Sequence, residues 1–141
     1  MIPTGRERVL FLCIHNSARS QMAEAWLRFL GGDTFEAASA GTDPSPIRPE
    51  AIEVMREVGV GLAAQKPKGM SEFDGMTFDT VVTVCDAVAE ACPIFTRAAR
   101  VLHWSIEDPA TRPSADPSRL EAFRQVRDEL RARIEAELLD R

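Results

Sequence analysis

The sequence predicts an α/β fold, a single three-layer sandwich domain over residues 1–141 with a parallel sheet covered by helices. Short apolar runs alternate along the chain with stretches in which apolar residues recur at helical spacing, which is the pattern of parallel α/β proteins. The 141 residues are 45% hydrophobic, which is enough for one domain with a full core. No internal repeat, low-complexity segment or second domain interrupts this pattern.

The first half of the chain predicts two strands and two helices. Residues 9–13 (VLFLC) form an apolar run without alternation, which is typical of a buried strand, and residues 35–41 (FEAASAG) predict a weaker strand. A helix is expected from Ala18 to Gly31, with a buried face of Met22, Ala23, Trp26, Leu27 and Leu30. Residues 49–59 (PEAIEVMREVG) predict a second helix, with a buried face of Ile52, Met55 and Val58.

The second half predicts two further strands and a long final helix. Residues 60–77 are expected to be loop, with one helical turn near residues 71–75, and residues 78–85 (FDTVVTVC) and 100–105 (RVLHWS) predict strands. Between these strands the alanine-rich residues 86–92 predict a short helix. After a proline-rich loop, Ser118 and Glu121 have the spacing of a capping box that opens the final helix. Its buried stripe is Leu120, Phe123, Val126, Leu130, Ile134 and Leu138.

Three chemically reactive side chains follow the ends of predicted strands. Cys13 ends the first strand, Cys85 ends the third, and Asp108 lies just past the fourth. Open parallel sheets bind their ligands beyond the carboxyl ends of the strands. The sequence therefore predicts a functional site at this edge of the sheet.

The turn after the first strand has the parts of an oxyanion site. Its residues (CIHNSARS) are Cys13, Ile14, His15, Asn16, Ser17, Ala18, Arg19 and Ser20. A loop that enters a helix N-terminus directs free backbone N–H groups into a concavity, and Arg19 can hold a tetrahedral anion bidentately. Asn16 tolerates the left-handed conformation that curls such a loop. The same donors favour a thiolate at Cys13, and the loop serines offer hydroxyls to that thiolate or to the helix end.

The stretch CIHNSARSQMAEAW (13–26) resembles the phosphate-loop signature of the low-molecular-weight protein tyrosine phosphatase fold, and most closely its branch of thioredoxin-coupled arsenate reductases. The resemblance extends through SAG (39–41), PEAIEVM (49–55), VVTVCDAVAEACP (81–93), HWSIEDPA (103–110) and FRQVRDEL (123–130). It implies a four-stranded parallel sheet in the order 2-1-3-4. It also implies a nucleophile, an oxyanion clamp, a thiolate stabiliser, a general acid and two resolving cysteines, which are respectively Cys13, Arg19, Ser20, Asp108, Cys85 and Cys92.

The resemblance implies a reaction that uses all three cysteines. Cys13 would attack arsenate while Asp108 protonates the departing oxygen, and Cys85 would attack the Cys13 sulfur and release arsenite. Cys92 would then attack Cys85 and carry the disulfide outward to thioredoxin. An intact helix over residues 86–92 would separate the last two cysteines by about 10.5 Å, so this segment is expected to unwind on oxidation. We expect a monomer that needs no cofactor or metal, with arsenate as substrate, thioredoxin as reductant and arsenic detoxification as its role.

Two positions depart from the family pattern. Ala18 stands where many members have a second loop cysteine, which this chemistry does not need. Lys68 stands where some members place an acidic ligand of a potassium ion, which favours a metal-free site. Asn16, Glu24 and Ser39 match the other potassium-site positions, so the sequence leaves this question open.

Composition and charge exclude several other classes. A formal net charge of −5 makes nucleic acid and anionic membranes poor partners. No apolar run has the length of a membrane span or of a secretory signal core, so we expect a cytoplasmic protein. Three cysteines in such a chain argue against a structural disulfide framework, and the absence of CxxC pairs argues against zinc.

Two alternative functions stay open. The first is a low-molecular-weight tyrosine phosphatase, although residues 108–112 (DPATR) contain no aromatic residue to wall a phosphotyrosine ring. Weak activity on small aryl phosphates is expected even for an arsenate reductase, because the loop should bind phosphate. The second is a non-enzymatic phosphocysteine carrier or redox sensor. Arg19 argues against a carrier, because a strong clamp holds the group in place, and Asp108 argues against a pure sensor.

Overall fold

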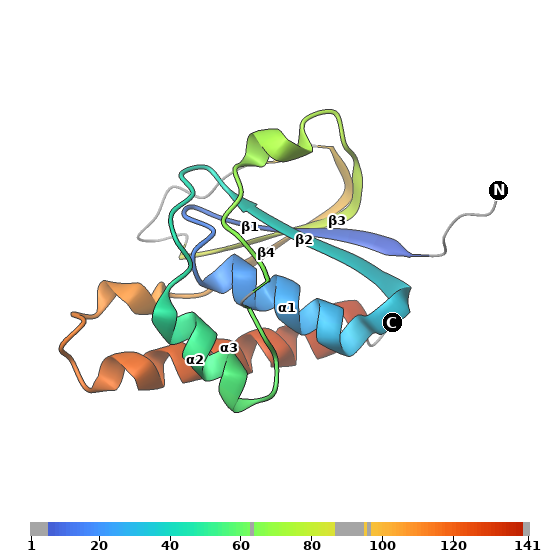
Figure 1. Cartoon of the computed structure of the whole chain (residues 1–141). Coiled ribbons are helices and arrows are strands. Elements are labelled where there is room, and N and C mark those ends of the chain that lie inside the picture. The colour runs from blue at the N-terminus through green and yellow to red at the C-terminus, as the bar shows by residue number, and fades with distance from the viewer. Residues whose placement is uncertain (1–5, 63, 87–94, 96, 140–141) are drawn as a thin grey trace.

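The computed structural model describes residues 6–62, 64–86, 95 and 97–139. Strands β1 (Glu7–Cys13), β2 (Phe35–Gly41), β3 (Phe78–Cys85) and β4 (Ala98–Ser105) form a parallel sheet in the order β2-β1-β3-β4 (Figure 1). The predicted fold class and strand order are therefore confirmed. The weaker predicted strand, β2, has the predicted bounds, as does β3, whereas β1 and β4 begin at Glu7 and Ala98 rather than at residues 9 and 100.

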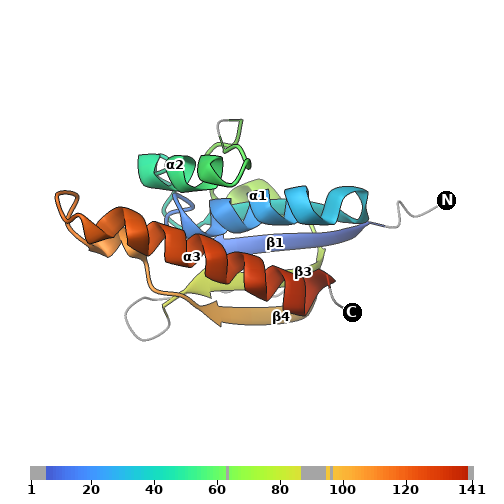
Figure 2. The same ribbon diagram turned by 90° about the horizontal axis from the view of Figure 1, so that it is seen from below.

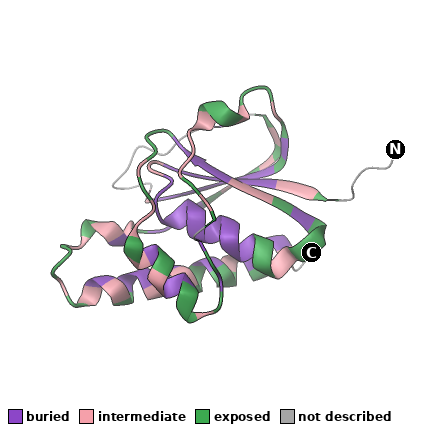
Figure 3. Ribbon diagram, in the orientation of Figure 1, coloured by how far each residue is buried: buried purple, intermediate pink, exposed green. Residues whose placement is uncertain are grey.

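Three helices lie on one side of the sheet and share one core with it: α1 (Arg19–Gly31), α2 (Pro49–Glu57), which packs against α3, and α3 (Ser118–Ile134). Figure 1 places all three below the sheet, and Figure 2 shows α1 and α3 running alongside the strands. Side chains from alternate positions of β1, Val9 and Phe11, enter this core. Residues 19–27 of α1 are all buried, and α1 accordingly appears purple over most of its length in Figure 3.

The opposite face of the sheet is covered differently. Leu10 and Leu12 of β1 pack there in a second cluster that includes Phe95, with Met70 and Phe73 from a 3-10 turn (Met70–Phe73) against it. Among the described residues this face therefore carries a 3-10 turn and loop side chains rather than an α-helix. Because residues 9–13 of β1 are buried on both faces, this part of the strand is an unbroken apolar run.

Helix α2 exposes a residue that was predicted to be buried. Ile52 is 37% exposed, whereas Ala51, Val54 and Met55 are fully buried. These three positions follow the i, i+3, i+4 spacing of one helical stripe, and Ile52 lies about 100° round the helix from Ala51. The prediction chose a neighbouring stripe that is equally apolar, and packing against α3 decided between them.

Helix α3 begins at Ser118, but the predicted capping box does not form. Pro117 occupies the N-cap position without a side-chain cap, and Asp116 Oδ1 accepts hydrogen bonds from the backbone N–H and the hydroxyl of Ser118, both at 2.8 Å. These bonds hold the pKa of the Asp116 carboxyl below its ordinary value. Glu121 pairs with Arg124 instead, at 3.4 Å. Asp116 therefore forms an Asx turn, in which its side chain accepts the backbone N–H of Ser118 at the start of the helix.

Two further expectations concern the segment between β3 and β4 and the presence of membrane-spanning helices. Residues 87–92 of the predicted short helix, including Cys92, lie outside the described residues. None of the helices that the structure describes is long and apolar enough to cross a lipid bilayer.

Candidate active site

The loop over residues 13–20 joins the end of β1 to the first turn of α1. Asn16 has a φ of +51°, so the predicted left-handed residue is confirmed. Gly41, at the end of the neighbouring strand β2, lies directly against this loop. A Cβ there would lie 2.5 Å from the Ile14 carbonyl oxygen and 2.8 Å from the Asn16 nitrogen, so only glycine fits. Sequence reasoning assigned Gly41 no role, although a glycine closing an apolar strand is the signal that marks such a close approach.

Cys13 is a free cysteine and is only 2% exposed. Its sulfur lies 2.8 Å from the Ser20 hydroxyl oxygen and accepts a hydrogen bond from the Asn16 backbone N–H at 3.2 Å. The sulfur therefore contacts both a backbone N–H and a side-chain hydroxyl of the loop. Such contacts stabilise negative charge on sulfur.

Arg19 is buried at the start of α1 and does not face solvent. Its Nη1 donates to the Ile106 carbonyl oxygen at 2.9 Å, and its Nη2 lies 3.7 Å from Asp108 Oδ2. Asp108 is itself held in place, because its Oδ1 accepts a hydrogen bond from the Ala110 backbone N–H at 2.9 Å. A guanidinium from the first loop and a carboxylate from beyond β4 thus meet at one site.

Cys85 ends β3, the strand that pairs with β1. The register pairs Leu12 with Thr83, so Cys13 and Cys85 terminate neighbouring strands at the same sheet edge. Cys85 is fully buried and disulfide-bonded, and its partner lies outside the described residues. Its carbonyl oxygen accepts a hydrogen bond from the Ile106 N–H at 3.3 Å. The same residue, Ile106, therefore contacts both Cys85 and Arg19.

The two histidines lie apart from one another and hold local structure. His15 Nδ1 lies 3.0 Å from the Asp43 carbonyl oxygen, and His103 Nδ1 lies 2.7 Å from the Thr83 hydroxyl. Ser17 caps no helix in the described structure, and its carbonyl oxygen accepts a bond from the Arg48 N–H at 2.8 Å. Among the residues that the structure describes, no three histidine, cysteine or acidic side chains are grouped to hold a metal.

The positions that match a potassium site in some family members carry a different arrangement here. Lys68 Nζ lies 3.5 Å from Glu24 Oε1, the carboxylate oxygen that also accepts the Ser39 hydroxyl at 2.5 Å. A potassium ion bound by these oxygens would lie beside a covalently tethered ammonium, and like charges at such a distance repel. The donor set therefore does not fit potassium while Lys68 is charged.

Gln21 supports the loop from α1, a role that sequence reasoning missed. Its side chain is fully buried, and Nε2 donates to Asn16 Oδ1 at 2.8 Å and to the Asn16 carbonyl oxygen at 3.1 Å. Gln65 Nε2 in turn donates to Gln21 Oε1 at 2.7 Å. A polar residue on the buried side of a predicted apolar helix is the sequence signal that could have found it.

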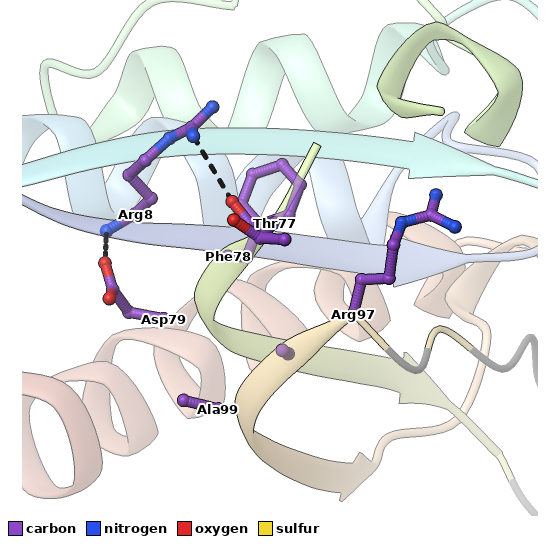
Figure 4. A pocket seen from close by; sticks show the side chains of 7 residues that line it. Arg8, Thr77, Phe78, Asp79, Arg97 and Ala99 are labelled. Carbon is purple, nitrogen blue, oxygen red and sulfur yellow. Dashed lines mark hydrogen bonds between the residues drawn. The ribbon is translucent and has the colours of Figure 1, made fainter. Parts of the chain in front are cut away.

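A separate hollow of about 450 Å³ lies at the amino ends of β1, β3 and β4, at the sheet edge opposite to Cys13 (Figure 4). Its lining is Arg8, Thr77, Phe78, Asp79, Arg97, Ala98 and Ala99. The Arg8 guanidinium donates to the Thr77 carbonyl oxygen at 3.2 Å and lies over the Phe78 ring, and Arg97 Nε donates to the Met76 carbonyl oxygen. Among the described residues, no cysteine or histidine lines this hollow, which separates it from the reactive groups at the other edge.

Comparison with known proteins agrees with this geometry. A family model described as low molecular weight phosphotyrosine protein phosphatase matches residues 8–140. The chain belongs to this family. An arsenate reductase of Halalkalibacterium halodurans is 35% identical to it over 92% of this chain and 94% of that protein. The low molecular weight phosphatase family resemblance that the sequence suggested is therefore confirmed.

Solved structures of family members superpose on the chain. A structure of an arsenate reductase in the phosphate binding state aligns with a TM-score of 0.81 and 30% identity, covering 95% of this chain and 98% of that chain. A thioredoxin-dependent arsenate reductase of Corynebacterium glutamicum aligns with a TM-score of 0.68 and 25% identity, covering 99% of this chain and 66% of that one.

Proposed function

We propose that this protein is a cytoplasmic, thioredoxin-dependent arsenate reductase that serves arsenic detoxification. One observation carries the proposal. The buried free Cys13 and the Arg19–Asp108 pair lie at the same sheet edge as Cys85, a disulfide-bonded cysteine at the end of the adjacent strand. Its curated relatives include arsenate reductases, and a structural relative is thioredoxin-dependent. A phosphatase of this fold needs one cysteine, whereas a reductase needs more.

In the first step the loop N–H groups and the Arg19 fork hold the arsenate oxygens. The Cys13 thiolate attacks arsenic, an S–As bond forms, and an As–O bond breaks. Asp108, whose Oδ2 lies 3.7 Å from Arg19 Nη2, acts as the general acid and supplies the proton with which that oxygen leaves as water. Burial of Cys13 and Arg19 keeps bulk water from competing for the adduct.

In the second step the Cys85 thiolate attacks the Cys13 sulfur. A sulfur–sulfur bond forms while the S–As bond breaks, and its electron pair stays on arsenic, which leaves as arsenite. Cys92 then attacks Cys85, which releases Cys13 as a thiolate and moves the disulfide to the Cys85–Cys92 pair. Thioredoxin reduces that pair with its own two thiols. A free Cys13 beside a disulfide-bonded Cys85 supports this order of events.

The proposal is tested by NADPH consumption coupled through thioredoxin reductase and thioredoxin. We expect oxidation of NADPH that depends on arsenate, with arsenite formed in equal amount, and no response to phosphate. Absence of arsenate-dependent consumption with thioredoxin, glutaredoxin and small thiols would remove the arsenate reductase assignment. Consumption with small thiols or glutaredoxin but not thioredoxin would remove only the choice of reductant.

Cys85→Ser is expected to lose arsenite release while it keeps hydrolysis of a small aryl phosphate. Hydrolysis needs only the groups around Cys13, whereas reduction of arsenic needs a second sulfur. The matched variant Cys92→Ser is expected to release about one equivalent of arsenite per enzyme and then stop, because Cys13 stays joined to Cys85. Arsenite is quantified after rapid mixing, and peptide mapping identifies the joined cysteines. Continued turnover by either variant would contradict the relay.

Asp108→Asn is expected to slow arsenate attack by about 10²–10⁴-fold, the usual contribution of a general acid. The amide oxygen can still accept the Ala110 N–H, so the loop should keep its shape. Competitive inhibition by phosphate measures anion binding and is expected to change little. An unchanged single-turnover rate would show that another group, or water, protonates the departing oxygen.

Tyrosine phosphatase activity is the second candidate, because the matching family model is described as a phosphotyrosine phosphatase. Residues 108–112, next to Arg19, contain no aromatic side chain that could stack on a phenyl ring. We expect only weak hydrolysis of aryl phosphates. Hydrolysis of phosphotyrosine peptides with a higher kcat/KM than that for arsenate would favour this candidate.

A further inference from the structure

A buried arginine stands at the start of α3. Among the described residues two arginines are buried, Arg19 in the reactive loop and Arg119, which is 8% exposed. Arg119 is the second residue of α3, and its guanidinium carbon lies 5.7 Å from the centre of the Phe123 ring, one turn further along the helix. Burial of a guanidinium costs free energy unless the group is paired and hydrogen-bonded. The groups that Arg119 binds therefore indicate its role.

The first partners of Arg119 belong to the turn that carries Asp108. Arg119 Nη1 donates to the carbonyl oxygen of Arg112 at 2.6 Å and to that of Ala110 at 3.3 Å. Within the turn, Asp108 Oδ1 accepts the Ala110 N–H at 2.9 Å. The internal bond shapes the turn, whereas the two bonds from Arg119 fix its backbone to α3. We call residues 108–112 the acid turn.

The second partner of Arg119 is Glu50, in the first turn of α2. Arg119 Nε and Glu50 Oε2 form an ion pair at 2.8 Å, with side chains that are 10% and 24% exposed. The same end of α2 binds the reactive loop, because the Arg48 N–H donates to the Ser17 carbonyl oxygen at 2.8 Å. Arg119 therefore joins the acid turn to the helix end on which the reactive loop also rests.

This link bears on the chemistry because a general acid works only where its proton can reach the departing oxygen. Asp108 lies between β4 and α3 and belongs to neither, so the acid turn depends on contacts for its position. Its Oδ2 lies 3.7 Å from Arg19 Nη2, next to the oxyanion clamp. Arg112 Nη1 also donates to the Ser118 hydroxyl, but Arg119 binds the backbone of the turn itself.

We propose that Arg119 is a positioning residue, which holds the backbone of the acid turn so that the Asp108 carboxyl faces the departing oxygen. The inference rests on the proposed function in one respect, that Asp108 is the general acid. An arginine with a purely structural role would affect every substrate alike. A residue that positions the general acid matters most where the leaving group needs a proton.

Two aryl phosphates separate these roles. The Cys13 sulfur attacks phosphorus, an S–P bond forms, and the bond from phosphorus to the aryl oxygen breaks, with its electron pair staying on that oxygen. Phenolate is basic and leaves well only with a proton from Asp108, whereas 4-nitrophenolate is stabilised and leaves without one. The ratio of kcat/KM for 4-nitrophenyl phosphate to that for phenyl phosphate therefore measures proton delivery. Because kcat/KM covers only the steps up to release of the phenol, later hydrolysis of the phosphocysteine does not affect it.

Arg119→Met removes the guanidinium and keeps an unbranched side chain. We expect kcat/KM for phenyl phosphate to fall about 10–10²-fold, which is part of the roughly 10²–10⁴-fold that a general acid contributes, and that for 4-nitrophenyl phosphate to fall less than about threefold. Asp108→Asn gives the reference for complete loss of the acid. Arg131→Met is the matched control, because it removes the same charge from α3 at a side chain that is 47% exposed. It is expected to change neither value.

The outcomes distinguish this inference from the proposed function. A wild-type ratio in natively folded Arg119→Met, beside a raised ratio in Asp108→Asn, would overturn the inference alone, as would an equal fall on both substrates. A wild-type ratio in Asp108→Asn would overturn the acid role of Asp108 and this inference with it. Arg119→Lys keeps a cation beside Glu50, but its Nζ ends one bond short of the Nη1 position, so we expect a smaller rise in the ratio. It decides in the same way if Arg119→Met does not fold.

A second measurement needs no substrate. Hydrogen exchange of the Ala110 and Thr111 amides is expected to be faster in Arg119→Met than in the unaltered protein, while the amides of β1 and β3 exchange as before. Equal exchange of the two turn amides in both proteins would overturn the proposal. This readout uses neither arsenate nor an aryl phosphate, so it still decides if the arsenate reductase assignment fails.

Discussion

Cys13→Ser is expected to abolish both arsenate reduction and aryl phosphate hydrolysis. A serine hydroxyl stays protonated at neutral pH and is a poor nucleophile without a base beside it, whereas the loop donors are arranged to stabilise a thiolate. The coupled thioredoxin assay and release of nitrophenol from its phosphate ester measure the two activities. Both are expected to fall to the rate of a blank without enzyme.

The control for this variant is anion binding. The loop N–H groups and Arg19 are unchanged, so Cys13→Ser should still bind phosphate, as calorimetry can measure. Serine is smaller than cysteine and close to it in shape, so the fold should hold. Retained arsenate turnover in a variant that binds phosphate normally would refute Cys13 as the nucleophile.

Arg19→Lys is expected to be nearly as damaging as Arg19→Ala, with kcat/KM lower by about 10²–10³-fold, the usual effect of losing one oxyanion donor. The guanidinium has two nitrogen atoms engaged in different directions, toward the Ile106 carbonyl oxygen and toward Asp108. An ammonium keeps the charge but cannot hold that planar fork, and it leaves a buried carbonyl oxygen without its donor.

Arg56→Lys is the matched control for Arg19→Lys, because Arg56 lies exposed on α2 with its ion pair at the surface. It should behave as the unaltered protein does. If Arg19→Lys also kept its kcat/KM within a few-fold, the clamp at Arg19 would act by charge alone. Measuring arsenate and phosphate binding together separates loss of binding from loss of rate.

The sequence alone determined the features that depend on neighbouring residues. Residues 80–85 (TVVTVC) are all buried and rich in β-branched side chains, which is the pattern of a strand covered on both faces, and the bounds of β3 could be predicted as they are. The loop could also be predicted, since a cysteine that ends a strand and an arginine that opens a helix lie only six positions apart. The left-handed Asn16 follows from the local sterics of that turn.

Only the tertiary structure decided which distant groups meet. Ile52 and Ala51 lie on equally apolar stripes, and contact with α3 selected Ala51 for the core. The approach of Asp108 to Arg19, of Gly41 to the loop and of Lys68 to Glu24 depends on the order in which the strands align. A local pattern reports the helix or strand propensity of a few neighbouring residues. These contacts arise instead from the packing of the whole sheet, and no short stretch of sequence encodes that packing.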